Sequence, residues 1–444
     1  MDETDIAVVG AGVSGIAAAV TAARLGCRTL LLEKSAFLGG IAVKGNIHTI
    51  CGLFINRSDG SPEMLYTGVP EEFARRLMSH DSVESPVKMG RVHVLLSRPK
   101  TIEETIQTLL KTEATLSVKY STQFCGVRLN NDRICHINAI VAGSRREIKV
   151  GAVVDCSGDA IVCRSAGVPV MAPDESTQVP AMIFPLINID SFVKSPRPVT
   201  PAKAGVHNMP EKLDCGLRRN DNNGGFSTFY GSVNIDHPGH FSIMAVRIKT
   251  MLKQAVNQGI LPQGSESVSL LPMLEKGSIA VKLNLGRFVR GFSSMGNSSI
   301  EEFANELKDH LFRFVQKNVA GFERCRVPSG EYPVLHRDGM KAKGVYVLSG
   351  EDVLNGKKFS DAATKGCWPI EKWDSAGDLD IRYLPESLYY DIPERSLRVP
   401  GIKNLMIAGK CISADNDAIA SARVIGSCLA TGEAAAKLAA RSLT

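Results

Sequence analysis

The cysteines of this sequence lack the spacings that disulfide or metal sites need. The eleven cysteines include no C-x-x-C pair, and no cysteine–histidine cluster has zinc-site intervals. An odd number of dispersed thiols is typical of a reducing compartment, where most are small core residues. The sequence therefore predicts free thiols, a cytoplasmic location and no bound metal.

Blocks of like charge and a membrane-type apolar run are also missing. The 52 basic and 46 acidic residues are scattered along the chain and give a formal charge of +6. The apolar stretch 6–25 follows acidic residues and is interrupted by glycines. We therefore expect no membrane segment and no nucleic-acid partner, and at most a weak preference for anionic substrates.

The feature that stands out is a glycine-rich turn between apolar segments, "VVGAGVSGIAAAV". The flanking pattern predicts a buried strand at 6–9, a helix at 16–25 and a second buried strand at 28–32. In such a unit Gly10 permits the turn, Gly12 lets a pyrophosphate approach the backbone, and Gly15 lets helix and strand pack closely. Val13 and Ser14 open the helix, whose N-terminus favours phosphate.

An acidic residue follows the second strand at the position that binds a ribose diol. Glu33 takes this place and Lys34 follows it. Strand, turn, helix and acid together predict a dinucleotide-binding unit. The motif alone does not separate NAD from FAD, because both contain the adenosine diphosphate half.

Three later stretches favour FAD: "EKSAFLGG" with Gly39 and Gly40, "VVDCSGDA" with Gly158 and Asp159, and "LMIAGKCISAD" with Gly409 and Asp415. The strand 405–408 returns about 250 residues after the first part of the sheet, whereas a simple nicotinamide domain is continuous. An alanine-rich helix then begins at about Ser427, preceded by Gly426. Its N-terminus is expected to face the flavin pyrimidine.

On these stretches, and above all on "YDIPERSLRVPGIKNLMIAGKCISADNDAIASARVIGSCLATGEAAAKLAA", the chain resembles the FAD-dependent oxidoreductases of the FAD-oxidored group. These are relatives of glutathione-reductase and fumarate-reductase-type flavoproteins. The resemblance implies that backbone around Val127 contacts adenine. The chain departs from the family pattern at one place. Many members carry a pair of arginines where this sequence has Met340 and Lys341. Lysine lacks the bidentate fork of arginine, so the resemblance does not carry over a carboxylate substrate.

The expected fold is α/β, a Rossmann-like FAD-binding domain of the glutathione-reductase type interrupted by a mixed α+β substrate domain. Its segments are 1–166 and 391–444 for the FAD-binding domain and 167–390 for the substrate or cap domain. Within the latter, the sequence predicts strands near 241–246 and 279–286, a helix at 299–318 and a loop at 218–226. His237 and His240 have metal-like spacing, but a turn is the preferred interpretation.

Four side chains are the catalytic candidates. His336 and Arg337 form a polar cluster with Asp338, in which arginine orients an anionic or carbonyl group and histidine moves the accompanying proton. Arg423 precedes the final helix and is a candidate for contact with flavin or substrate. His48 has three open interpretations: covalent flavin attachment, a place on the substrate side, or an ordinary loop residue. Cys51 is a candidate redox thiol or an inert one.

The function expected from these observations is an FAD-dependent oxidoreductase that transfers hydride between a small organic substrate and flavin N5. Its second partner would be an external electron acceptor or donor, and a homo-oligomer is compatible with the sequence. Two alternatives remain. One is a flavin monooxygenase or halogenase, and the other is a non-catalytic FAD-binding electron-transfer subunit of a complex.

Overall fold

The computed structural model describes residues 3–57, 59–83, 85–172, 178–190, 192–193, 233–234, 236, 238–286, 297–374 and 379–444. The chain divides into two compact units, the first made of Met1–Ile183 and Tyr332–Thr444 and the second of Phe184–Glu331. The second unit lies inside the 167–390 segment expected to form the substrate domain, whereas both ends of that segment, 167–183 and 332–390, belong to the first unit. The predicted loop 218–226 and His237 lie outside the described residues.

The first half of the first unit begins with β1 and α1 and reaches β13, which crosses the boundary between the units. Its helices and strands are β1 (Glu3–Val9), α1 (Val13–Arg24), β2 (Thr29–Leu32), α2 (Ile41–Lys44), β3 (Thr49–Ile50), β4 (Phe54–Asn56), β5 (Pro62–Met64), α3 (Val69–Asp81), β6 (Val87–Met89), β7 (Val92–Leu96), α4 (Pro99–Lys111), β8 (Leu116–Lys119), β9 (Thr122–Asn130), β10 (Arg133–Val141), β11 (Ser144–Asp155), α5 (Ile161–Ser165), β12 (Val170–Met171) and β13 (Ala181–Leu186).

The remainder of the first unit lies C-terminal to the second. It consists of β18 (Val334–Leu335), β19 (Lys341–Ala342), α9 (Gly350–Leu354), β20 (Ala362–Gly366), β21 (Ile370–Trp373), β22 (Leu379–Arg382), β23 (Tyr390–Pro393), η1 (Glu394–Ser396), β24 (Leu405–Ile407), η2 (Gly409–Cys411), α10 (Asn416–Ala422) and α11 (Ile425–Arg441).

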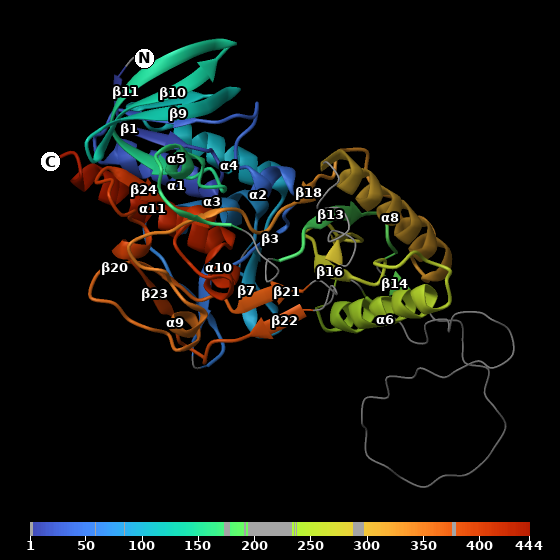
Figure 1. Cartoon of the computed structure of the whole chain (residues 1–444). Helices are drawn as coiled ribbons and strands as arrows, with labels where there is room; N and C mark the ends of the chain where they lie inside the picture. The colour runs from blue at the N-terminus through green and yellow to red at the C-terminus, as the bar shows by residue number, and fades with distance from the viewer. Residues whose placement is uncertain are drawn as a thin grey trace, which may run out of the picture. The chain divides into compact units, whose positions relative to one another are not determined.

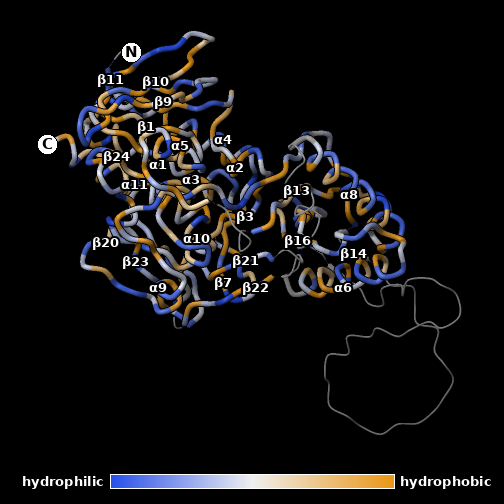
Figure 2. Tube along the Cα trace, in the orientation of Figure 1, coloured by the Kyte–Doolittle hydropathy of each residue, from blue (hydrophilic) through white to orange (hydrophobic). Residues whose placement is uncertain are grey.

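A sheet of seven strands in the described residues organises the first unit (Figure 1). Six of them lie in the order β8-β2-β1-β11-β10-β9, and the seventh, β24, pairs with β11. The pairs β8–β2, β2–β1 and β1–β11 are parallel. β11 uses its far edge twice, because residues 144–149 pair antiparallel with β10 and residues 153–155 pair parallel with β24. The exposed beginning of β11 is hydrophilic, as Figure 2 shows. This arrangement confirms the α/β fold and the late return of the last parallel strand.

The two faces of the sheet have separate cores, because side chains alternate along each buried strand. Ile6 and Val8 of β1 pack into the core on the side of α1, α3, α4 and α11. Ala7 and Val9 point to the opposite side and pack with α5 and the β10–β11 meander. α1 and α11 lie side by side (Figure 1).

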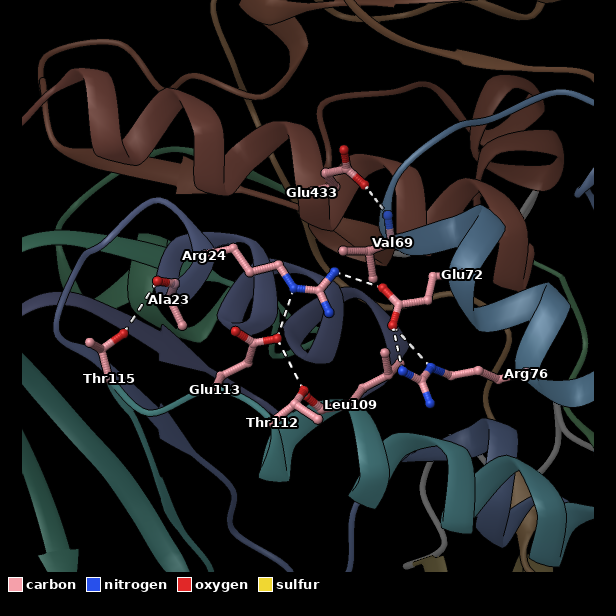
Figure 3. Close-up of polar contacts among 10 residues, drawn as sticks. All are labelled: Ala23, Arg24, Val69, Glu72, Arg76, Leu109, Thr112, Glu113, Thr115 and Glu433. Atoms are coloured by element: carbon pink, nitrogen blue, oxygen red, sulfur yellow. Dashed lines mark hydrogen bonds and ion pairs between the residues drawn. The ribbon is translucent and has the colours of Figure 1, made fainter.

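Ion pairs join the helices of the first face at their exposed ends (Figure 3). Arg24 of α1 donates to Glu72 of α3 at 2.7 Å and to Glu113, just after α4, at 2.8 Å. Arg76 also pairs with Glu72. Glu433 of α11 accepts from the amide of Val69, the first residue of α3, at 2.8 Å. The amide of Val69, which has no partner within its helix, thereby gains a hydrogen-bond acceptor.

The second unit contains a hairpin and two long helices among its described residues. Its elements are β14 (Phe192–Val193), β15 (Val233–Asn234), α6 (Pro238–Asn257), β16 (Val268–Pro272), β17 (Ile279–Asn284) and α8 (Asn297–Asn318). The strand near 279–286 and the helix at 299–318 are confirmed by β17 and α8. The strand near 241–246 and the turn at His240 are wrong, because both fall in α6. Met244, Ile248 and Leu252 are buried on one face of that helix, a spacing of four that the strand interpretation overlooked.

None of the helices in the described part of the chain is both long and apolar enough to cross a membrane.

Candidate functional site

The glycine-rich turn places each of its three glycines under a different constraint. Gly10 has φ +98°, and a Cβ there would lie 2.7 Å from the carbonyl oxygen of Cys156. A Cβ on Gly15 would lie 1.8 Å from the carbonyl oxygen of Gly10, so helix and turn are in direct backbone contact. A Cβ on Gly12 would meet no atom within 4 Å. Gly12 is therefore the position with room for a ligand.

Gly12 is also the N-cap of α1, and no side chain among the described residues caps the helix there. Val13 and Ser14, both buried, form the first turn. The first amides of a helix lack intrahelical partners and carry the positive end of its dipole. An open glycine at an uncapped helix N-terminus fits a pyrophosphate, as the sequence predicts.

Glu33 lies beside this turn and is 8% exposed. One carboxylate oxygen accepts the amide of Ala11 at 2.8 Å and the other accepts the amide of Ser35 at 2.8 Å. A carboxylate offers about four lone-pair sites, so this one retains capacity for ribose hydroxyls. Lys34 is exposed.

The Gly39–Gly40 loop lies directly on the same turn. The amide of Gly39 donates to the carbonyl of Ala11 at 2.8 Å, and a Cβ on Gly40 would lie 3.3 Å from the Cα of Gly12. Both glycines have positive φ. The loop therefore forms a second wall beside Gly12.

The C-terminal segment reaches this site through β24. Gly409, with φ +63°, donates its amide to Thr431 at 3.1 Å, and a Cβ on it would lie 2.5 Å from the Ser14 hydroxyl. The amide of Gly426 donates to the carbonyl of Cys51 at 2.9 Å. The fully buried Ser427 follows in α11. Thus α11 begins against the segment that contains His48 and Cys51, and its body packs on α1.

A third glycine turn brings the candidate catalytic segment close. Gly158 has φ +82°, and a Cβ on Gly339 would lie 2.1 Å from the Gly158 carbonyl oxygen and 2.5 Å from Asp159. The ammonium of Lys410 donates to the carbonyl of His336 at 3.2 Å. Segment 336–341 is therefore packed on the 158–159 turn and beside Gly409. Gly339 and Lys410 were not predicted as site residues from the sequence, although a glycine directly before Met340 is a signal for a close backbone approach.

Arg337 and Asp338 belong to a buried group that we call the polar cluster, made of Gln178, Arg337, Asp338 and Arg423. The amide of Gln178 donates to Asp338 at 2.9 Å, and the Arg423 guanidinium donates to the Gln178 side-chain oxygen at 3.0 Å. Arg423 Nε lies 3.9 Å from Asp338 Oδ1. Gln178 was missed because its partners are about 160 and 245 residues away.

Arg337 is 9% exposed, donates to the carbonyl of Val179 and lies over the ring of Trp373 at 5.6 Å. Burial, reinforced by the nearby Arg423 charge, lowers the pKa of Arg337 to about 9. The side chain therefore remains a cation at neutral pH. His336, in contrast, is exposed.

The remaining candidates have structural partners in the described residues. Asp415 caps α10 by accepting the amides of Asp417 and Ala418 at 3.0 and 2.7 Å, and it also accepts the amide of Gly350. Val127 lies in β9, where its amide donates to the Ser165 hydroxyl at 3.1 Å. His48 is 7% exposed. Cofactor or substrate contact by these three residues stays a prediction.

Comparison with known proteins decides the family. The model of the family "FAD dependent oxidoreductase" matches residues 5–444. The chain belongs to this family. FAD is accordingly its cofactor, and the open glycine turn, Glu33 and the meeting of both chain ends fit that group.

Solved structures similar to this family member are distant in sequence and in structure. A geranylgeranyl bacteriochlorophyll reductase-like protein from Thermoplasma acidophilum is 14% identical with a TM-score of 0.44, covering 100% of this chain and 77% of that one. GidA from Aquifex aeolicus is 12% identical with a TM-score of 0.46, covering 99% and 64%. The p-nitrophenol 4-monooxygenase PnpA from Pseudomonas putida DLL-E4 is 9% identical with a TM-score of 0.39, covering 78% and 71%. No curated protein matches the chain.

Proposed function

We propose that this FAD-dependent oxidoreductase transfers hydride between a small organic substrate and the flavin, with Arg337 and His336 on the substrate side. The observation that carries the proposal is the packing of segment 336–341 on the 158–159 turn, beside Gly409. This contact places the chain segment that carries the buried Arg337 against the glycine turns that suit the cofactor.

Several residues would hold FAD. The N-terminus of α1 at Gly12 would hold the pyrophosphate, Glu33 would accept hydrogen bonds from the ribose hydroxyls, and the N-terminus of α11 would hold the pyrimidine ring. When bound, the flavin supplies hydride chemistry at N5. Arg423 lies immediately before α11, where its charge and the helix dipole favour negative charge.

Arg337 binds and orients the substrate. Its guanidinium is held by the Val179 carbonyl and Trp373, and a buried cation attracts an anionic or carbonyl oxygen more strongly than an exposed one. His336, the preceding residue, is exposed and carries the accompanying proton between the substrate and solvent on an imidazole nitrogen. The expected substrate class is therefore a small carbonyl compound or organic anion.

The test starts from the absorbance spectrum of the purified protein, which should show bound FAD. Anaerobic photoreduction followed by a screen of carbonyl, amine and enoate compounds should find one that reoxidises the flavin. Arg337→Lys should then raise KM for that compound at least 10-fold while the flavin spectrum stays unchanged, because lysine lacks the planar fork. A protein that holds no FAD and takes none up would refute the proposal.

Arg395→Lys is the matched control, since Arg395 makes an exposed ion pair with Asp361. Equal KM values for the Arg337 variant, the control and the wild type would remove Arg337 from the substrate side. Incorporation of oxygen into the product by the reduced protein would replace the proposal by the monooxygenase alternative. Retention of FAD with no turnover of any donor or acceptor would favour the electron-transfer subunit.

A further inference from the structure

Three buried polar atoms of the polar cluster make no hydrogen bond within the described residues: Gln178 Nε2, Asp338 Oδ1 and Arg423 Nε. Gln178 is 4% exposed, and the side chains of Asp338 and Arg423 are 2% and 15% exposed. Leaving such a group unsatisfied costs about 1–3 kcal/mol. Three such atoms, on three separate chain segments, indicate a ligand that supplies their missing hydrogen bonds.

The Gln178 side chain fixes which atoms remain for that ligand. Arginine only donates hydrogen bonds, so the amide oxygen of Gln178 faces Arg423 and its Nε2 group is left as a donor. Asp338 is held from the other side, because its Oδ2 accepts the Gln178 backbone amide. The free atoms are thus two donors, on Gln178 and Arg423, and one acceptor, on Asp338.

The distance between Asp338 and Arg423 also indicates a bound ligand. Their facing atoms, Oδ1 and Nε, are 3.9 Å apart, whereas a charge-assisted hydrogen bond closes to about 2.7–2.9 Å. Both side chains are tethered by Gln178, which keeps this gap open. A complementary ligand presents one donor to Asp338 and an acceptor to each of the two donors.

The cofactor of this family carries that pattern on one edge. In FAD, the pyrimidine side of the isoalloxazine presents O2, N3–H and O4, an acceptor–donor–acceptor sequence, whereas the adenine base has a donor beside an acceptor. We propose that Gln178, Asp338 and Arg423 bind the pyrimidine edge of the flavin, with Asp338 accepting N3–H. This inference rests on the proposed function, since it takes the same site.

The position of Arg423 in the fold agrees with this role. Arg423 is the C-cap of α10, and the next residue, Val424, is the N-cap of α11. No side chain among the described residues caps α11, so its positive end is available to the electron-rich oxygens of the ring. Asp338, packed beside Gly339 on the 158–159 turn, supplies the acceptor from the opposite chain segment.

The test compares FAD with N3-methyl-FAD, in which the donor at N3 is replaced by a methyl group. Binding to apoprotein is measured by the change in flavin fluorescence. The wild type should bind FAD at least 10-fold more tightly than the methylated cofactor, and Asp338→Ala should reduce this preference to within about 3-fold. Gln178→Leu should weaken FAD binding about 10-fold while retaining the preference, and both variants should shift the visible bands of bound FAD.

Asp132→Ala, which breaks a surface pair with Lys403, is the control and should behave as the wild type. A wild type that binds both cofactors equally well overturns the inference, and that comparison needs no variant to fold. Equal binding of the two cofactors does not contradict the proposed function, because FAD is still bound. A wild type that binds neither cofactor refutes the proposed function itself, so the two failures are distinguishable.

Discussion

The glycine turn at 10–15 and the polar cluster are built on opposite principles. In the turn, backbone meets backbone, and a Cβ on Gly15 would lie 1.8 Å from its neighbour. In the polar cluster, side chains are tethered with a 3.9 Å gap between Asp338 and Arg423 and with buried atoms lacking hydrogen bonds in the described residues. The packing around Gly10 and Gly15 is complete within the protein, whereas the polar cluster, in our proposal, is completed by a ligand. Stability and ligand binding should therefore respond differently to substitution in the two regions.

The largest contrast is expected within the turn itself, between Gly15→Ala and Gly12→Ala. The methyl group at position 15 meets a backbone carbonyl that cannot move without opening the turn. We expect Gly15→Ala to destabilise the apoprotein by at least about 3 kcal/mol or to prevent folding. Urea unfolding followed by circular dichroism measures this effect.

Gly12→Ala is the matched comparison, because a Cβ there meets no atom within 4 Å. Apoprotein stability should change by no more than about 0.5–1 kcal/mol, the cost of alanine at an N-cap. FAD affinity, measured by fluorescence titration, should fall at least 10-fold. Unchanged affinity would show that the open side of Gly12 does not receive the cofactor.

An effect of intermediate size is expected in a buried group whose hydrogen bonds are all made within the protein, and it gives a comparison for the polar cluster. The Tyr390 hydroxyl pairs with the Ser421 hydroxyl at 2.7 Å, and Ser421 also donates to the carbonyl of Trp368. Tyr390→Phe should destabilise the apoprotein by about 1–2 kcal/mol, because it removes a made bond in a buried setting. Gln178→Leu should cost less in the apoprotein, since it also removes an unsatisfied donor. The reverse order of the two unfolding free energies would contradict the assignment of Gln178 to a ligand.

The smallest effect is expected at the exposed ion pairs of Figure 3. The hydrogen bond from Arg24 lowers the pKa of Glu72, and Arg76 lowers it further. A carboxyl group whose pKa is lower in the folded than in the unfolded protein stabilises the fold at pH values above its unfolded-state pKa. This stabilisation is lost as the pH falls through the folded-state pKa. Glu72→Gln should therefore cost about 0.5–1 kcal/mol at pH 7 and less at pH 4. An equal cost at both pH values would mean that charge plays no part.

The parts of the fold that depend on the spacing of residues close together in the sequence could be predicted. The turn at 10–15, its strands and the helices α1, α8 and α11 follow from glycine positions and apolar periodicity within a few residues. The error at 241–246 arose because a short apolar window fits a strand or a helix equally well. Gln178 was beyond prediction, since its role depends on Asp338 and Arg423, which only the folded chain brings beside it.

The double use of β11 has a consequence for biosynthesis. Residues 153–155 pair with β24, which lies about 250 positions further along the chain. The nucleotide-binding sheet therefore cannot be completed until the ribosome has synthesised the second unit and Leu405–Ile407 have left the exit tunnel. Until then the nascent chain presents an unpaired apolar strand edge, which is the surface that promotes aggregation and recruits chaperones. Slow translation or early termination within the last tenth of the chain should therefore yield insoluble protein.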